Sequence, residues 1–150
     1  MKKVTITAKI YSYALKNHKF IPQNLRQTLV KRGFHIHQFG DLRNGCTSAG
    51  PHFNPTSSDH GDYNTSVRHA GDVGNIEFPA NLDHEKDFDD FSRTIEGISL
   101  NPASSKSVIG RTFVLHASVD DLGVTDHELS KTTGNAGGRF ACGVIGLVKP

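Results

Sequence analysis

Seven residues with metal-binding side chains are concentrated in this chain of 150 residues. They are His35, His37, His52, His60, His69, Asp72 and His116. The set holds six of the nine histidines, and its first six members lie within residues 35–72. Imidazole is the commonest metal ligand among side chains. Six imidazoles and one carboxylate exceed what a single tetrahedral zinc ion needs, so the pattern predicts two metals that share ligands.

Two of these histidines belong to an alternating run that is typical of a β-strand. His35 and His37 alternate with Phe34 and Ile36, so both imidazoles share one face while apolar side chains occupy the other. His116 lies on a different predicted strand and can add a third imidazole. Imidazoles in a tetragonal arrangement suit Cu(II).

The other ligand-type residues come from a polar stretch. His60, His69 and Asp72 provide three of the four ligands of a closed zinc site. His52 lies between the two groups, and an imidazole that loses both protons can bind one metal at each nitrogen. Residues 40–72 and 117–139 are long polar loops, in which metal coordination can replace apolar packing. A lone histidine is more often an ordinary polar residue, and we interpret His18, His84 and His127 as surface residues.

Alternation of apolar and polar residues elsewhere predicts an all-β fold. The predicted strands cover residues 4–11, 34–37, 112–116 and 140–148, with two more near 73–78 and 94–100. The run 140–148 is apolar enough for a buried strand. One segment differs, because Pro22, Leu25, Leu29 and Gly33 are spaced as in a short helix over residues 22–33.

The length, charge and hydropathy of the chain limit the number of domains, the partners and the location that we expect. The chain suits a single domain over residues 1–150. Its net charge of +2, with scattered lysines and arginines, argues against a nucleic-acid partner. No apolar run is long enough for a membrane span, and the N-terminus lacks the apolar core of a signal peptide. We therefore expect a cytoplasmic protein.

Cys46 and Cys142 are the two cysteines of the chain. In a cytoplasmic protein, one interpretation is two reduced thiols in the core. The alternative is a disulfide that closes a long loop and stabilises the fold through the entropy of the unfolded chain. The residues alone leave both possibilities open.

Six segments carry the motifs of a known family. They are GFHIHQFGD (33–41), GCTSAGPHFNP (45–55), RHAGDVGN (68–75), IGRTFVLH (109–116), DDLG (120–123) and TGNAGGRFACGVIG (133–146). On these motifs the chain strongly resembles the copper/zinc superoxide dismutases. The resemblance implies a Greek-key β-sandwich, or flattened eight-stranded barrel, of immunoglobulin-like type. Long metal-binding and electrostatic loops would carry one copper and one zinc ion per subunit.

The resemblance also implies roles for single residues. Copper is assigned to His35, His37, His52 and His116. Zinc is assigned to His52, His60, His69 and Asp72, with His52 as the bridge and a proton carrier in catalysis. Asp120 matches a carboxylate that orients one ligand of each metal. Arg139 and Thr133 match residues of the substrate channel, and Cys46 and Cys142 match an intrasubunit disulfide.

The implied activity is conversion of superoxide to dioxygen and hydrogen peroxide by a copper ion that cycles between Cu(II) and Cu(I). The implied partners are superoxide, a second copy of the chain in a homodimer, and a copper chaperone. The alternative is a non-catalytic copper/zinc-binding or copper-delivery module on the same fold. One departure concerns the fold, because the segment before Gly33 is shorter than usual and leaves the completion of the sandwich by residues 1–32 in question.

Overall fold

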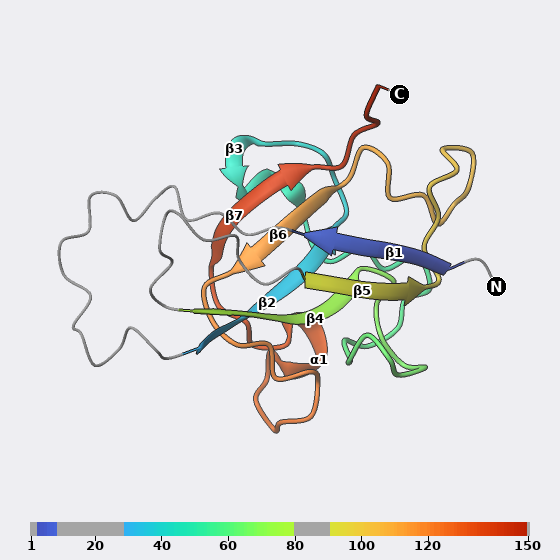
Figure 1. Cartoon of the computed structure of the whole chain (residues 1–150). Helices are drawn as coiled ribbons and strands as arrows, with labels where there is room; N and C mark the ends of the chain where they lie inside the picture. The colour runs from blue at the N-terminus through green and yellow to red at the C-terminus, as the bar shows by residue number, and fades with distance from the viewer. Residues whose placement is uncertain (1–2, 9–28, 80–90, 150) are drawn as a thin grey trace, which may run out of the picture.

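Two antiparallel β-sheets face each other in the computed structural model, which describes residues 3–8, 29–79 and 91–149 (Figure 1). The smaller sheet pairs β1 (Lys3–Ala8) with β5 (Phe91–Glu96). The larger sheet has the order β4-β2-β6-β7. Its strands are β4 (Asp72–Pro79), β2 (Leu29–His37), β6 (Thr112–His116) and β7 (Arg139–Val144). The all-β prediction is confirmed.

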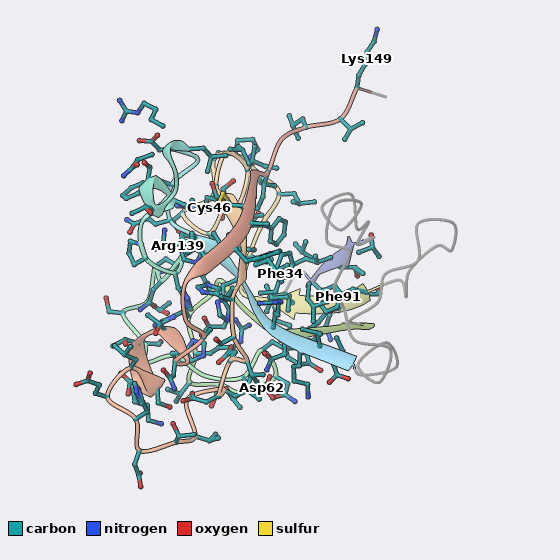
Figure 2. The ribbon with its side chains drawn as sticks, turned by 90° about the vertical axis from the view of Figure 1, so that its left-hand side faces the viewer. Phe34, Cys46, Asp62, Phe91, Arg139 and Lys149 are labelled. Atoms are coloured by element: carbon teal, nitrogen blue, oxygen red, sulfur yellow. A yellow bond between two sulfur atoms is a disulfide. The ribbon has the colours of Figure 1, made fainter. Side chains whose placement is uncertain are left out.

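The core lies between the two sheets and is built mainly from isoleucine and valine. Its members are Ile6, Phe34, Ile36, Phe53, Ala70, Val73, Ile76, Ile95, Ile98 and Val108. Phe34 of β2 stacks on Phe113 at 4.9 Å between ring centroids. Phe91 of the other sheet meets the Phe34 ring edge-on at 6.0 Å (Figure 2). These aromatic contacts join the two sheets behind the histidine-bearing strand.

Residues 33–37, the C-terminal half of β2, are buried on both faces. Phe34 and Ile36 point into the core, as the alternation predicted. His35 and His37 on the opposite face are also buried, with relative exposures of 0% and 1%. The loop between β3 (Arg43–Cys46) and β4 covers this second face. Imidazoles placed there are therefore shielded from bulk water.

Short elements interrupt the long loops. Besides β3, the first loop contains a 3₁₀ turn, η3 (Thr47–Ala49), and the second contains α1 (Ser130–Thr133). A disulfide between Cys46 and Cys142 joins the end of β3 to β7, which confirms the bridge that the resemblance implied. No helix in the described ranges has the length and apolar character needed to cross a membrane.

Three predictions of local structure were wrong in part. Residues 29–33 belong to β2 and not to a helix, because they pair with residues 75–79 of β4. Residues 22–28 lie outside the described ranges. The strand predicted near residues 94–100 covers Phe91–Glu96, since Gly97 with φ of 83° ends it. The strand predicted over residues 140–148 ends at Val144 and is largely exposed, with Phe140 at 61%.

Candidate metal centre

The structure brings the seven ligand-type residues together in one buried cluster. His35 and His37 come from β2, His116 ends β6, and Asp72 begins β4. The loop between β3 and β4 contributes His52, His60 and His69. All seven have relative exposures of 6% or less. Residues that are distant in sequence therefore share one site without bulk water.

Backbone hydrogen bonds to β2 place the loop-borne ligands. The Phe53 amide donates to the Ile36 carbonyl at 2.8 Å, and the Ile36 amide donates to the Gly71 carbonyl at 2.8 Å. His52 and Asp72 are the chain neighbours of Phe53 and Gly71, so these bonds set both side chains beside His35 and His37. The His60 amide donates to the Lys131 carbonyl at 2.8 Å, which ties the same loop to α1.

The first group of donors consists of four imidazoles. One ring nitrogen from each of His35, His37, His52 and His116 lies within 4.8 Å of the others. The Nε2 atoms of His37 and His116 are 3.3 Å apart. Four converging nitrogen ligands, three of them on strands, suit a Cu(II) ion.

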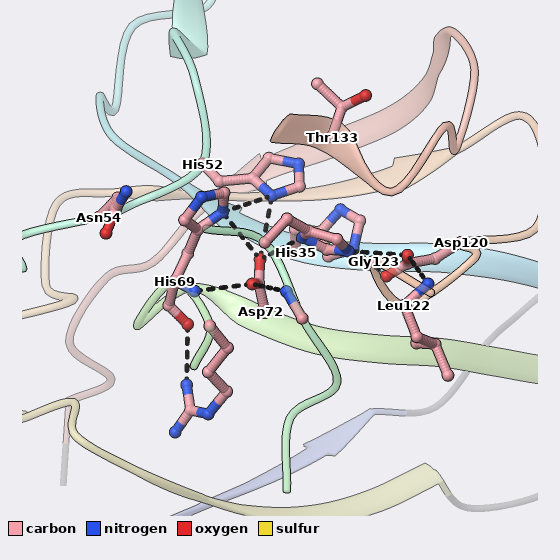
Figure 3. A network of polar contacts seen from close by, with 12 residues as sticks. His35, His52, Asn54, His69, Asp72, Asp120, Leu122, Gly123 and Thr133 are labelled. Carbon is pink, nitrogen blue, oxygen red and sulfur yellow. Dashed lines mark hydrogen bonds and ion pairs between the residues drawn. The ribbon is translucent and has the colours of Figure 1, made fainter. Parts of the chain in front are cut away.

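The second group surrounds one carboxylate oxygen. Asp72 Oδ1 lies 3.0 Å from Nδ1 of His52, 3.0 Å from Nδ1 of His60 and 3.2 Å from Nδ1 of His69 (Figure 3). Asp72 Oδ2 accepts hydrogen bonds from the amides of His69, at 2.8 Å, and Gly61, at 3.2 Å. The backbone thus turns Oδ1 toward the imidazoles. Three nitrogens and one oxygen match a closed zinc site.

His52 belongs to both groups of donors. Its Nδ1 faces Asp72 and lies 3.3 Å from Nδ1 of His69. Its Nε2 is the nitrogen left for the first group, and it is buried without a hydrogen-bond partner. Figure 3 shows His52 and His69 on one side of Asp72, with His35 and Asp120 on the other. The geometry makes a single imidazole the link between two ligand sets.

The ring nitrogens that face away from the cluster are held by acceptors. His37 Nδ1 donates to the Gly50 carbonyl at 2.7 Å, and His116 Nδ1 donates to the Gly137 carbonyl at 3.2 Å. Asp120 accepts from His35 Nε2 and from His60 Nε2, both at 2.8 Å. A proton on the outer nitrogen leaves a lone pair on the inner one, so these bonds prepare each ring to bind a cation.

Unpartnered nitrogens inside the cluster test whether metal ions fit. Within the described ranges, the buried side-chain atoms without a hydrogen-bond partner are His35 Nδ1, His52 Nε2, His60 Nδ1 and Arg32 Nε. The three imidazole nitrogens among them face the cluster. Burying such atoms unpaired is costly, and a metal cation would satisfy each of them. The residues present therefore fit both a copper and a zinc ion.

The pKa values of the carboxylates and imidazoles follow from burial and pairing. Burial by itself raises the pKa of Asp72 and Asp120, but histidine hydrogen bonds hold both well below their ordinary values. Burial lowers the pKa of His37 to about 3 and that of His116 to about 4, which keeps these rings neutral and able to bind metal. For His60, burial opposes protonation, yet the hydrogen bond to Asp120 and the adjacent Asp72 carboxylate raise the pKa to about 9.

Arg139 and Thr133 lie at the margin of the cluster. Arg139 donates to the carbonyls of Cys46 and Gly50, each at 2.6 Å, and of Thr47 at 3.0 Å. The Gly50 carbonyl also accepts from His37, so the guanidinium and this ligand share one acceptor. Thr133 ends α1 and lies on the same side of the cluster as His52 (Figure 3).

Sequence reasoning missed two residues beside Asp120: Asn75 binds its backbone, and Gly134 leaves room for its carboxylate. The Asn75 side chain accepts from the Asp120 amide at 2.8 Å and donates to the Asp120 carbonyl at 2.9 Å. Gly134, with φ of 65°, lies directly against the Asp120 carboxylate. Asn75 lies in the motif at residues 68–75 and Gly134 in the motif at residues 133–146. Membership of these motifs is the sequence feature that could have identified them. His127 is exposed as expected, whereas His18 and His84 lie outside the described residues.

Comparison with known proteins identifies the family of this chain. Residues 3–145 match the copper/zinc superoxide dismutase (SODC) family. A superoxide dismutase [Cu-Zn] of Schizosaccharomyces pombe is 55% identical over 118 residues, which are 79% of this chain and 72% of the relative. A putative superoxide dismutase [Cu-Zn] of Autographa californica nuclear polyhedrosis virus is 49% identical over 118 residues, covering 78% and 74% of the two chains.

A solved structure gives the same result for the fold. The clock protein EA4 superposes with a TM-score of 0.70 at 45% identity, over 80% of this chain and 72% of the other. An all-β fold with two adjoining buried ligand sets defines a two-metal β-sandwich protein. The chain belongs to the copper/zinc superoxide dismutase family.

The close approach at Gly134 generates a first prediction. A Cβ on this residue would overlap Asp120 Oδ1 and lie 2.5 Å from His60 Nε2, so Gly134→Ala must displace the carboxylate. We expect loss of bound metal and a metal-free protein less stable by about 3 kcal/mol. Metal analysis and urea unfolding check this. Gly138→Ala is the matched control, since nothing lies within 4 Å of a Cβ there, and equal behaviour of the two variants would contradict the prediction.

The shifted pKa values predict how the stability of the metal-free protein depends on pH. The pKa of His60 is raised to about 9, so its protonation stabilises the folded protein. This contribution to stability is complete below pH 6.5 and is lost as the pH rises toward 9. His37 and His116, with pKa values lowered to about 3 and 4, lose theirs as the pH falls below 6.5. Stability should therefore be greatest near pH 6.5, with each group changing it by up to ~1.4 kcal/mol per pH unit.

Urea unfolding from pH 5 to pH 9 measures this profile. His60→Gln should abolish the decline above pH 6.5 and leave the acid side in place. A stability that rises steadily up to pH 9 would show that the His60 assignment is incorrect.

Proposed function

We infer that this chain catalyses the dismutation of superoxide, in which two superoxide anions and two protons yield dioxygen and hydrogen peroxide. The observation that carries this function is His52, whose two ring nitrogens face two different sets of metal ligands. When bound, copper supplies the one-electron chemistry by alternating between Cu(II) and Cu(I), while zinc is redox-silent. The names of the relatives state the same activity for those proteins.

The two donor sets support a division of the ligands between the metals. His35, His37, His52 and His116 would hold copper, because all four present imidazole nitrogens and three come from strands. His52, His60, His69 and Asp72 would hold zinc, because three nitrogens surround one carboxylate oxygen. Asp120 would orient one ligand of each metal, His35 and His60, through its two oxygens.

One of the two protons of the product would come from His52. His52 Nε2 is the ring atom that would hold a proton whenever it does not bind copper, and it would deliver that proton to the reduced anion. The second proton comes from water. Asp72 keeps Nδ1 of His52 in place at 3.0 Å, so the ring can accept and release a proton at Nε2 without turning.

Arg139 would bind the substrate anion and Thr133 would narrow the path opposite it. The Arg139 guanidinium is permanently charged, and three hydrogen bonds to carbonyl groups fix its position. Fixed cationic donors attract a small anion and cost no reorganisation during the reaction. Support for this role comes from the position of Arg139, which donates to the same Gly50 carbonyl that accepts a hydrogen bond from His37.

The alternative of a copper-delivery module has less support. Delivery of Cu(I) between proteins favours exchangeable thiolate ligands. Both cysteines of this chain are joined in the Cys46–Cys142 disulfide and are unavailable as thiolates. Buried ligands held by carbonyls and carboxylates also favour retention of a metal over its transfer.

The assembly and location of the protein are part of the same proposal. Apolar side chains are exposed on and after β7, with Val144 at 49%, Leu147 at 78% and Val148 at 92%. A homodimer would cover them, and the expected contact residues are Gly40, Leu42, Ile109, Gly110, Gly146 and Leu147. We place the protein in the cytoplasm, where a copper chaperone would load it.

The activity predicts a specific response to changes at Arg139. Arg139→Gln should lower the rate of superoxide decay by about 10-fold or more while copper and zinc contents stay near one each, because an anion-binding cation is lost. Arg139→Lys should retain part of the rate, since the charge remains without the planar fork. Pulse radiolysis with metal analysis measures both. A wild-type protein that holds both metals and leaves superoxide decay unchanged is not a dismutase.

The exposed residues near the C-terminus predict a dimer in solution. Leu147→Glu should shift the protein toward a monomer, because a charge would be buried in the contact. Val124→Glu is the control, since Val124 is similarly exposed at 81% on the loop before α1. Sedimentation at micromolar concentration gives the mass, and a wild-type value near 16.3 kDa would exclude the dimer.

A further inference from the structure

Arg93 occupies a position that usually holds an apolar side chain. Along β5 the side chains of Phe91, Arg93 and Ile95 are turned inward, whereas Ser92 and Thr94 are exposed. Ile95 on the same face is fully buried in the core. An arginine in this row requires partners for its guanidinium, because charged groups are rarely placed there unpaired.

The partners of Arg93 belong to the other sheet. Its Nη1 atom donates to the Val73 carbonyl and, at 3.3 Å, to the Asn75 carbonyl. These two carbonyls flank Gly74 on β4, directly after the metal-ligating position Asp72. Arg93 thus joins β5 to the segment of β4 that carries one ligand of the proposed zinc site.

The same guanidinium contacts the metal-binding loop. Its central carbon lies 4.0 Å from the centroid of the Tyr63 ring and 4.9 Å from that of Phe91. Tyr63 lies in the loop between His60 and His69, and its ring packs against the core. Cation–π contacts of this kind hold a loop to a strand more firmly when they are partly desolvated.

Gly74 provides the space for this arrangement. A Cβ at Gly74 would lie 2.8 Å from Arg93 Nη1 and 3.3 Å from Tyr63 Cδ1, and the φ angle of 85° also favours glycine. The arginine, the tyrosine ring and the β4 backbone therefore meet at one closely packed point beneath Asp72.

We propose that Arg93 is a positioning residue for the zinc half of the centre. By clamping Tyr63 and the carbonyls on either side of Gly74, it holds His60, His69 and Asp72 near their metal-binding positions. The described contacts of Arg93 do not reach His35, His37 or His116, the copper ligands that β2 and β6 carry. The inference rests on the proposed division of ligands between zinc and copper. Preorganised ligands bind with less loss of conformational entropy, so the clamp raises the affinity for zinc.

Three variants test the clamp against one control. Arg93→Ala and Tyr63→Leu each remove one side of it, and Arg93→Lys keeps the charge without the planar stack. Thr94→Ala is the control, because Thr94 lies next to Arg93 on the exposed face, where its hydroxyl contacts that of Thr5 at 3.1 Å. Zinc affinity is measured with a competing chelator and copper affinity with a separate competitor, on protein that is folded by circular dichroism.

We expect Arg93→Ala and Tyr63→Leu each to weaken zinc binding by about 10–100-fold, with copper binding changed by less than about threefold. The double variant Arg93→Ala/Tyr63→Leu should bind zinc no more weakly than the more affected single variant, because each substitution removes the same interaction. Cobalt(II) in the zinc site should show altered visible bands in both single variants and not in Thr94→Ala. Arg93→Lys should give an intermediate zinc affinity.

Equal losses of zinc and copper affinity would overturn the proposal, as would an unchanged zinc affinity in Arg93→Lys and Tyr63→Leu. If Arg93→Ala does not fold, those two variants decide the outcome. Failure of the proposed function is distinguishable, because an inactive wild-type protein with both metals bound would leave the zinc-specific effect of the clamp intact.

Discussion

The hydrogen bonds of the Asp120 carboxylate hold the two halves of the metal centre together. Its oxygens accept from His35, which a central strand carries, and from His60, which a loop carries, each at 2.8 Å. The Asn75 side chain forms two hydrogen bonds with the backbone of Asp120, and Gly134 leaves room for the Asp120 side chain. A buried carboxylate that accepts two imidazole protons must remain ionised, and this charge helps to balance the cations that the centre is built to hold.

The division between strands and loops explains how a small core supports such a site. Ligands on β2 and β6 are positioned by sheet hydrogen bonds and by the apolar face behind them. Ligands on the β3–β4 loop depend on a few tethers, which are backbone bonds to β2, the link from His60 to Lys131 and the contacts of Arg93. The disulfide restrains the same loop from its other end. Metal binding and folding of this loop are therefore coupled.

Much of the fold and site could be predicted from local patterns. Alternation identified β1, β4, β6 and the histidine-bearing end of β2, because each buries one regular face. The errors arise where the tertiary arrangement of the strands overrides a local sequence pattern. Residues 29–33 form a strand because their pairing with β4 overrides a helical pattern. The apolar run after residue 140 lies at the surface, because β7 is the edge strand of its sheet and Val144 ends it.

The kinds of ligand and the need for two cations were determined by the sequence alone, since six histidines and one aspartate exceed what one tetrahedral metal ion needs. The tertiary structure decided which nitrogen of each ring faces inward, because that depends on the carbonyls of Gly50 and Gly137 and on Asp120. It also decided the role of Arg93, whose partners on β4 and in the metal-binding loop lie 18 residues or more away in the chain. Side-chain chemistry is encoded locally, whereas the direction of a lone pair is set by groups that only folding brings within hydrogen-bonding distance.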